Sequence, residues 1–167
     1  MVKTDDYLEL MEIMKTLPEN EINDVLYNGT VIQRTAALKF TDLDKVVDAL
    51  HDSDPTVRAN AINVIRESDD LTFIAKNGEE FGFLVEDPSP AVKKELLNLI
   101  DNMGGRMYLS GPCAAMPLPN TERCHYVFRD IVDYLKSDED EVVRGMAEDI
   151  QNDKDFYQKP KGMGLDR

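Results

Sequence analysis

The chain has 167 residues, of which 42% are hydrophobic and 31% are charged, and its formal net charge is -14. This composition is typical of a folded domain that buries a core without disulfides or a structural metal. Such an acidic surface repels nucleic acid and anionic membranes, so neither is expected as a partner. Because no apolar run is long enough to cross a bilayer and no signal peptide begins the chain, a cytoplasmic protein is expected.

Apolar residues at helical spacing predict an opening helix followed by two alternating series of amphipathic helices. The opening helix carries Tyr7, Leu10, Met11 and Met14 on one face. The first helices of the series are expected near residues 22–26, 43–50, 81–85 and 128–135. The second helices, which share a different apolar spacing, are expected near residues 32–40, 57–65, 92–100 and 143–150.

Short polar links rich in Pro, Gly, Ser and Asp separate the two helices of each pair. Pro55 and Pro90 stand where the first turn of a helix needs no amide hydrogen, so each is expected to begin a second helix. Neither helix of such a pair can bury its apolar stripe alone, and stacked neighbours would share one core. The sequence therefore predicts an all-α fold, an α-solenoid of about four stacked hairpins with an N-terminal capping helix.

One short segment recurs in the second helices. The sequence DPTVRANA at 54–61 has a near copy, SPAVKKEL, at 89–96, and a partial copy, VRGMA, at 143–147. The pattern resembles the second-helix signature of HEAT repeats, an armadillo-like family, over roughly residues 21–152. In that family, loop aspartates and helix arginines form a polar ladder between repeats, which here implies Asp52, Arg58, Asp87, Lys93, Asp138 and Arg144. Gln33 replaces the basic residue in the first repeat, whose turn has no aspartate, so that repeat is expected to be a degenerate cap.

Two segments depart from the repeat pattern. Residues 104–120, GGRMYLSGPCAAMPLPN, account for a long interval before the last pair and are predicted to form an inserted loop. The loop is expected to pack back on the solenoid, to contact a partner or to be disordered. Residues 154–167, here called the tail, follow a single domain at 1–153 and are expected to be flexible, to dock on the last hairpin or to bind an acidic face of the array.

Cys113, Cys124 and His125 form the one cluster that suggests chemistry. Two cysteines are too few for a disulfide framework and suit a reducing compartment. Structural zinc needs four ligands, usually in close pairs such as CxxC, so no metal or cofactor is expected. A nucleophilic Cys–His pair needs its two side chains to converge, but adjacent residues on a helix do not face each other. Cys124 is therefore expected to be a small apolar residue of the core. Cys113 would reach His125 only if the loop folds over the helix.

The resemblance to HEAT repeats implies a non-enzymatic protein-binding or scaffold module, in which the second helices line the inner face. The exposed positions of these helices combine amides with one acid each, which favours a polar or basic segment of another protein. The candidate partner-binding residues are Asn60, Asn63, Glu67, Glu95, Asn98, Asn102 and Glu148, with Tyr108 and Met116 of the loop. The alternative is an accessory or lyase-like subunit that uses Cys113, Cys124 and His125, as some bilin lyase subunits with related repeats imply.

Overall fold

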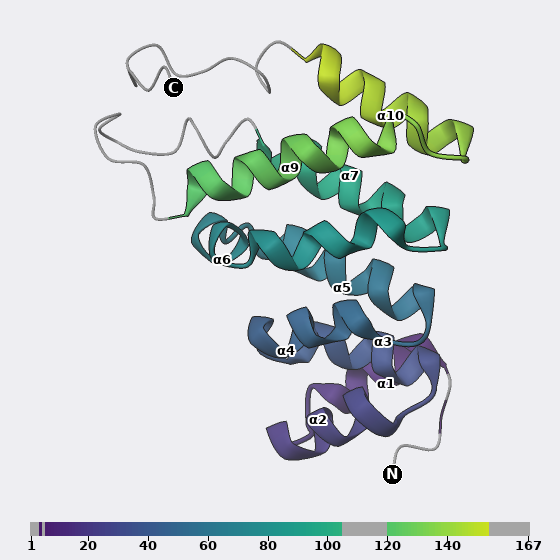
Figure 1. Cartoon of the computed structure of the whole chain (residues 1–167). Helices are drawn as coiled ribbons and strands as arrows, with labels where there is room; N and C mark the ends of the chain where they lie inside the picture. Colours follow the sequence, from purple (N-terminus) through teal and green to yellow (C-terminus); the bar gives the residue numbers. More distant parts are fainter. Residues whose placement is uncertain (1–3, 5, 105–119, 154–167) are drawn as a thin grey trace. The chain divides into compact units, whose positions relative to one another are not determined.

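The computed structural model describes Thr4 and residues 6–104 and 120–153 (Figure 1). Every regular element within these residues is a helix, which confirms the all-α prediction. The chain forms two compact units, Met1–Asp69 and Asp70–Arg167. Tyr108, Cys113 and Met116 lie outside the described residues, as does the tail, so the expectations placed on them stay predictions.

The described residues of the first unit form five α-helices with two short 3₁₀ extensions. They are α1 (Tyr7–Met14), α2 (Glu19–Asn28), α3 (Val31–Ala37) with η1 (Leu38–Phe40), α4 (Leu43–Asp48) with η2 (Ala49–His51), and α5 (Pro55–Ser68). Consecutive helices pack as pairs, α2 on α3 and then α4 with η2 on α5, and both α1 and α5 contact α3. The residues that share this core are fully buried and include Leu10, Leu38, Leu50, Val57 and Ile62.

Local sequence sets the helix boundaries in this unit. Thr30 and Gln33 form a capping box at the start of α3. Asp54 caps α5 by accepting a hydrogen bond from the Thr56 amide at 2.8 Å, and Pro55 occupies the first turn. Asp69 ends α5 in the left-handed conformation, with φ 56°. Pro55 therefore begins a helix in this unit, as the sequence predicts.

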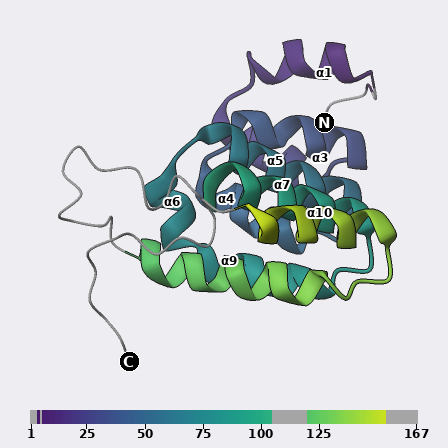
Figure 2. The same ribbon diagram turned by 90° about the horizontal axis from the view of Figure 1, so that it is seen from above.

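The second unit contains α6 (Leu71–Lys76), the 3₁₀ helix η3 (Gly78–Glu86), α7 (Pro90–Gly104), α9 (Thr121–Leu135) and α10 (Glu141–Asn152). The helix α9 contacts α6, η3 and α7, while α10 lies against both α7 and α9 (Figure 2). Phe81 of η3 and Phe128 of α9 meet in the core with ring centroids 6.1 Å apart. Both rings are fully buried, so they form the centre of this unit.

The close packing of α9 on η3 depends on a glycine. A Cβ atom at Gly78 would lie 2.7 Å from Sγ and 3.0 Å from Cα of Cys124. The same construction at Gly82, also in η3, meets nothing within 4 Å. Only the absence of a side chain at Gly78 allows Cys124 to approach this closely.

The predicted apolar stripes agree with the buried residues in most helices. Along α7, all five predicted positions, from Val92 to Ile100, are fully buried. The stripe predicted for α3 is wrong at its first position, because Ile32 is 42% exposed whereas the neighbouring Gln33 is buried. The short helix α6 was not predicted, and it supplies Ile74 to the buried core. In the part of the chain that the structure describes, no helix is both long and apolar enough to span a membrane.

Candidate functional site

Among the described residues of the second unit, a groove between α7 and α10 is the strongest candidate for a binding site. It has a volume of about 210 Å³. Its lining consists of three aspartates, one amide and three apolar side chains, and is called the acidic groove below: Leu97, Asn98, Asp101, Met146, Asp149, Ile150 and Asp153.

Helical spacing explains why acidic and apolar side chains meet in this groove. Met146 and Ile150 are four residues apart on α10, so they lie on one face of the helix, and Asp153 is the C-cap residue that follows it. Leu97 and Ile150 are buried and belong to the contact between the two helices, whereas the aspartates are exposed. The groove thus combines an apolar floor with a carboxylate rim.

The charge of the acidic groove is one-sided. Three of its seven lining residues are aspartates, and no lysine, arginine or histidine is among them. Within residues 6–104 and 120–153, neither Asp101 nor Asp149 forms an ion pair or a hydrogen bond with its side chain. The carboxylates of Asp101 and Asp149 therefore create a local negative potential that favours a cationic ligand.

The candidate residues on α7 and α10 are only partly brought together by this groove. Asn98 lines it, but Glu95, Asn102 and Glu148 do not. The predicted residues do not include the three aspartates or Met146, because they follow stripes that pass through Asn102 on α7 and Glu148 on α10 instead. The spacing of Met146, Asp149, Ile150 and Asp153 was the available signal, since it places acids beside the apolar stripe of the same helix.

The candidate residues on α5, in the first unit, make bonds within their own helix, and Glu67 also pairs with Lys39 of η1 at 3.9 Å. The Asn60 amide donates to the backbone oxygen of Thr56 at 2.8 Å, and the Asn63 amide donates to Glu67 Oε1 at 3.0 Å. Arg66 in turn donates to Asn63 Oδ1. The polar groups of α5 are therefore partly engaged, whereas Asp101 and Asp149 on the acidic groove are not.

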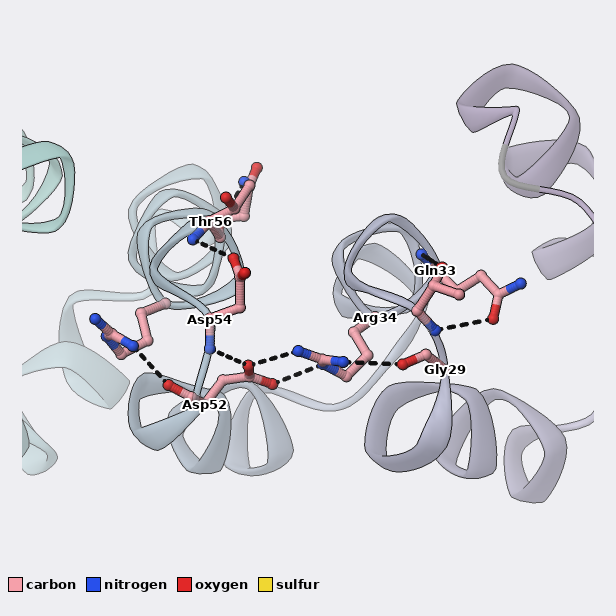
Figure 3. Close-up of polar contacts among 9 residues, drawn as sticks. Gly29, Gln33, Arg34, Asp52, Asp54 and Thr56 are labelled. Carbon is pink, nitrogen blue, oxygen red and sulfur yellow. Dashed lines mark hydrogen bonds and ion pairs between the residues drawn. The ribbon is translucent and has the colours of Figure 1, made fainter. Parts of the chain in front are cut away.

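A network of polar contacts joins the helix pairs of the first unit (Figure 3). Arg34 of α3 donates from Nε and Nη2 to the two carboxylate oxygens of Asp52, both at 2.9 Å, and from Nη1 to the backbone oxygen of Gly29 at 2.9 Å. This fork geometry is the strongest arrangement of an arginine with a carboxylate. In the first helix pair, the basic residue that binds the turn is therefore Arg34, one position after Gln33.

A similar ion pair lies in the second unit. Lys93 of α7 places Nζ 2.5 Å from Oδ2 of Asp138, in the turn before α10. Burial by itself would raise the pKa of Asp138. The hydrogen bonds from Lys93 and from the Asp140 amide, together with the Lys93 charge, nevertheless hold this pKa below its ordinary value.

The turn aspartates also organise their own turns. Oδ1 of Asp52, Asp87 and Asp138 each accepts a hydrogen bond from the backbone amide two residues later, at 2.8 to 2.9 Å. Arg58 and Arg144 each donate from Nη1 to the backbone oxygen of the aspartate six residues earlier, at 2.7 Å. The same sequence pattern thus forms the same local contacts in both units.

Cys124 and His125 both lie in the core of the second unit. Both side chains are buried, and the Cys124 thiol donates a weak hydrogen bond to the backbone oxygen of Ile74 at 3.7 Å. Burial raises the pKa of Cys124 to about 12. Burial and the nearby Arg129 charge lower the pKa of His125 to about 4. The thiol is therefore protonated at neutral pH, which makes it a poor nucleophile, and its predicted place in the core is confirmed.

Comparisons with known proteins give no further guide to this site. No family model, curated protein or solved structure matches the chain. Among the residues that the structure describes, no three His, Cys, Asp or Glu side chains are grouped so that they could hold a metal ion, and this includes the acidic groove.

Proposed function

We propose that this protein is a non-enzymatic binding module of HEAT-like helical hairpins, and that its acidic groove holds a basic segment of another protein. The observation that carries the proposal is the pair of carboxylates, Asp101 and Asp149, which lack partners among the described residues and stand over a buried apolar floor. A lysine or arginine side chain fits this combination, because its aliphatic stem packs on apolar surface while its charged end reaches a carboxylate.

The proposed HEAT-like architecture is supported by the recurring turn contacts. In both units an aspartate bonds to the amide two residues later and a basic residue binds the turn. In such arrays, neighbouring second helices form a continuous binding surface. The acidic groove lies between two of the proposed second helices, α7 and α10.

A binding role is favoured over the lyase-like alternative by the state of Cys124. A nucleophilic cysteine needs access to solvent and a lowered pKa, whereas Cys124 is 1% exposed and its pKa is raised to about 12. Cys113, which the lyase-like alternative also uses, lies outside the described residues, so its role stays a prediction.

The test is capture of partners from the native cell by three versions of the full chain. The groove variant is Asp101→Lys with Asp149→Lys, and the matched control is Asp130→Lys with Asp133→Lys on exposed positions of α9. We expect one protein to be retained by the wild type and the control but lost with the groove variant. A synthetic peptide of its most basic segment should bind the same way, with at least a tenfold weaker affinity for the groove variant. Equal binding to all three versions would overturn the proposal.

A further inference from the structure

The acidic groove ends where the described part of the chain ends. Asp153 lines the groove, and the tail begins with the next residue. The chain as a whole carries a charge of -14, but the tail, KDFYQKPKGMGLDR, has four basic residues and only two acidic ones. It also carries two adjacent aromatic residues, Phe156 and Tyr157. Charge and apolar character are thus complementary between the groove and the segment attached to its wall.

We propose that the tail is an intramolecular ligand of the acidic groove, so that a basic segment of a partner must displace it. In this arrangement Phe156 and Tyr157 cover the apolar floor formed by Leu97, Met146 and Ile150. The tail lysines reach the carboxylates of the rim. The effect on partner binding rests on the proposed function, whereas the place of the tail in the groove does not.

The length of the tail is sufficient for this contact. The groove follows α10 from Met146 to its C-cap residue Asp153, and the helical part is about 9 Å long at a rise of 1.5 Å per residue. An extended chain covers about 3.3 Å per residue, so Phe156 lies within about 10 Å of Asp153 and Lys161 within about 26 Å. A tail that turns back after Asp153 can therefore place its first lysines and both rings along the whole groove.

Attachment to the groove wall makes even a weak contact effective. A short flexible connection gives an effective concentration of about 1 mM. If the free tail peptide binds with a Kd of about 0.1 mM, the attached tail occupies most grooves and weakens an external ligand roughly tenfold. A partner segment therefore has to bind the groove tightly enough to displace the attached tail.

The experiment uses the full chain with ¹³C-methyl-labelled methionine, since the Met146 methyl reports directly on the groove. Met146→Leu identifies its signal. The tail variant carries Lys154→Glu, Lys159→Glu and Lys161→Glu. The control carries the same change of charge at three exposed lysines outside the groove, Lys15, Lys39 and Lys76. We expect the Met146 signal to move in the tail variant and in 0.5 M NaCl, where charge contacts are screened, but not in the control.

Binding of a synthetic peptide of residues 154–167 supplies the second measurement. This peptide should bind the tail variant about tenfold more tightly than the wild type, because the attached tail no longer competes. Adding Asp101→Asn and Asp149→Asn to the tail variant should remove that binding. An unmoved Met146 signal together with equal peptide affinities would overturn the inference. The proposed function would still stand if the groove variant lost its partner in the capture experiment.

Discussion

The ion pair between Arg34 and Asp52 allows a quantitative test of the contacts that join helix pairs. Replacement of Arg34 by Met removes the charge and the fork while keeping much of the side-chain volume. It leaves the Asp52 carboxylate with one described donor, the Asp54 amide, and removes the bond to the Gly29 oxygen. The expected result is a clear loss of stability in the first unit.

The magnitude follows from burial. The two side chains are 15% and 14% exposed, so the pair lies closer to the buried limit than to the surface limit. Breaking a buried pair costs about 3–5 kcal/mol, and an exposed pair contributes about 0–1 kcal/mol. We therefore expect Arg34→Met to lower the free energy of unfolding by about 2–3 kcal/mol. Arg34→Lys should recover less than half of this loss, because lysine cannot bind both carboxylate oxygens and Gly29 together.

Urea denaturation of the full chain measures these changes, and a double-mutant cycle with Asp52→Asn isolates the pair. Asparagine keeps an acceptor for the Asp54 amide, so the cycle reports mainly on the charge and the fork. We expect a coupling energy of about 1–2 kcal/mol. Lys15→Met serves as the exposed control, since its pair with Glu12 is 54% and 73% exposed, and should change stability by less than about 0.5 kcal/mol. A coupling energy for Arg34 and Asp52 no larger than this control value would refute the reasoning.

Three further predictions concern the second unit. Gly78→Ala should destabilise the protein by about 1–3 kcal/mol because its Cβ meets Cys124, whereas Gly82→Ala should be nearly neutral; urea denaturation of both variants checks this difference. In a Cys113→Ser background, Cys124 should react with iodoacetamide at pH 8 at least a hundredfold more slowly when native than in urea, and equal rates would contradict its burial. Folding lowers the pKa of His125 from 6.5 to about 4. The free energy of unfolding should therefore keep the full contribution of His125 above pH 6.5 and decrease as the pH is lowered from 6.5 to 4. Urea titrations at each pH should show a smaller decrease for His125→Phe.

Apolar spacing and turn residues predict most helices of the fold. The helices α5, α7, α9 and α10 follow regular apolar spacing, and their predicted core residues are mostly buried. The prediction is wrong at the start of α3, where apolar spacing places Ile32 in the core, whereas Ile32 is exposed and Gln33 is buried. Gln33 can occupy the buried position because its side chain accepts from the Thr30 amide at 3.1 Å and donates to the Thr4 oxygen at 3.1 Å. The bond with Thr30 is the local capping box, whereas the bond with Thr4 is a tertiary contact, and hydrophobic spacing registers neither.

The candidate site was harder to predict than the fold. Asn98 was selected from helical spacing and does line the acidic groove, but Asp101, Asp149 and Asp153 were not selected. The sequence shows that these aspartates are near apolar positions of their own helices. It does not show which edge of α7 faces which edge of α10, because that depends on how the two helices pack. A groove formed by two helices therefore emerges only from the structure.

Photo-cross-linking from inside the acidic groove in the native cell tests the proposed function most directly. The full chain carries benzoylphenylalanine in place of Met146, and the control carries it in place of Tyr134, which is 53% exposed on α9. We predict a covalent adduct from position 146 to a Lys- or Arg-rich segment of another protein, with a higher yield in the tail variant and none from position 134. Adducts from position 134 alone, or no adduct to another protein from position 146, would contradict the proposal that this groove binds a basic partner segment.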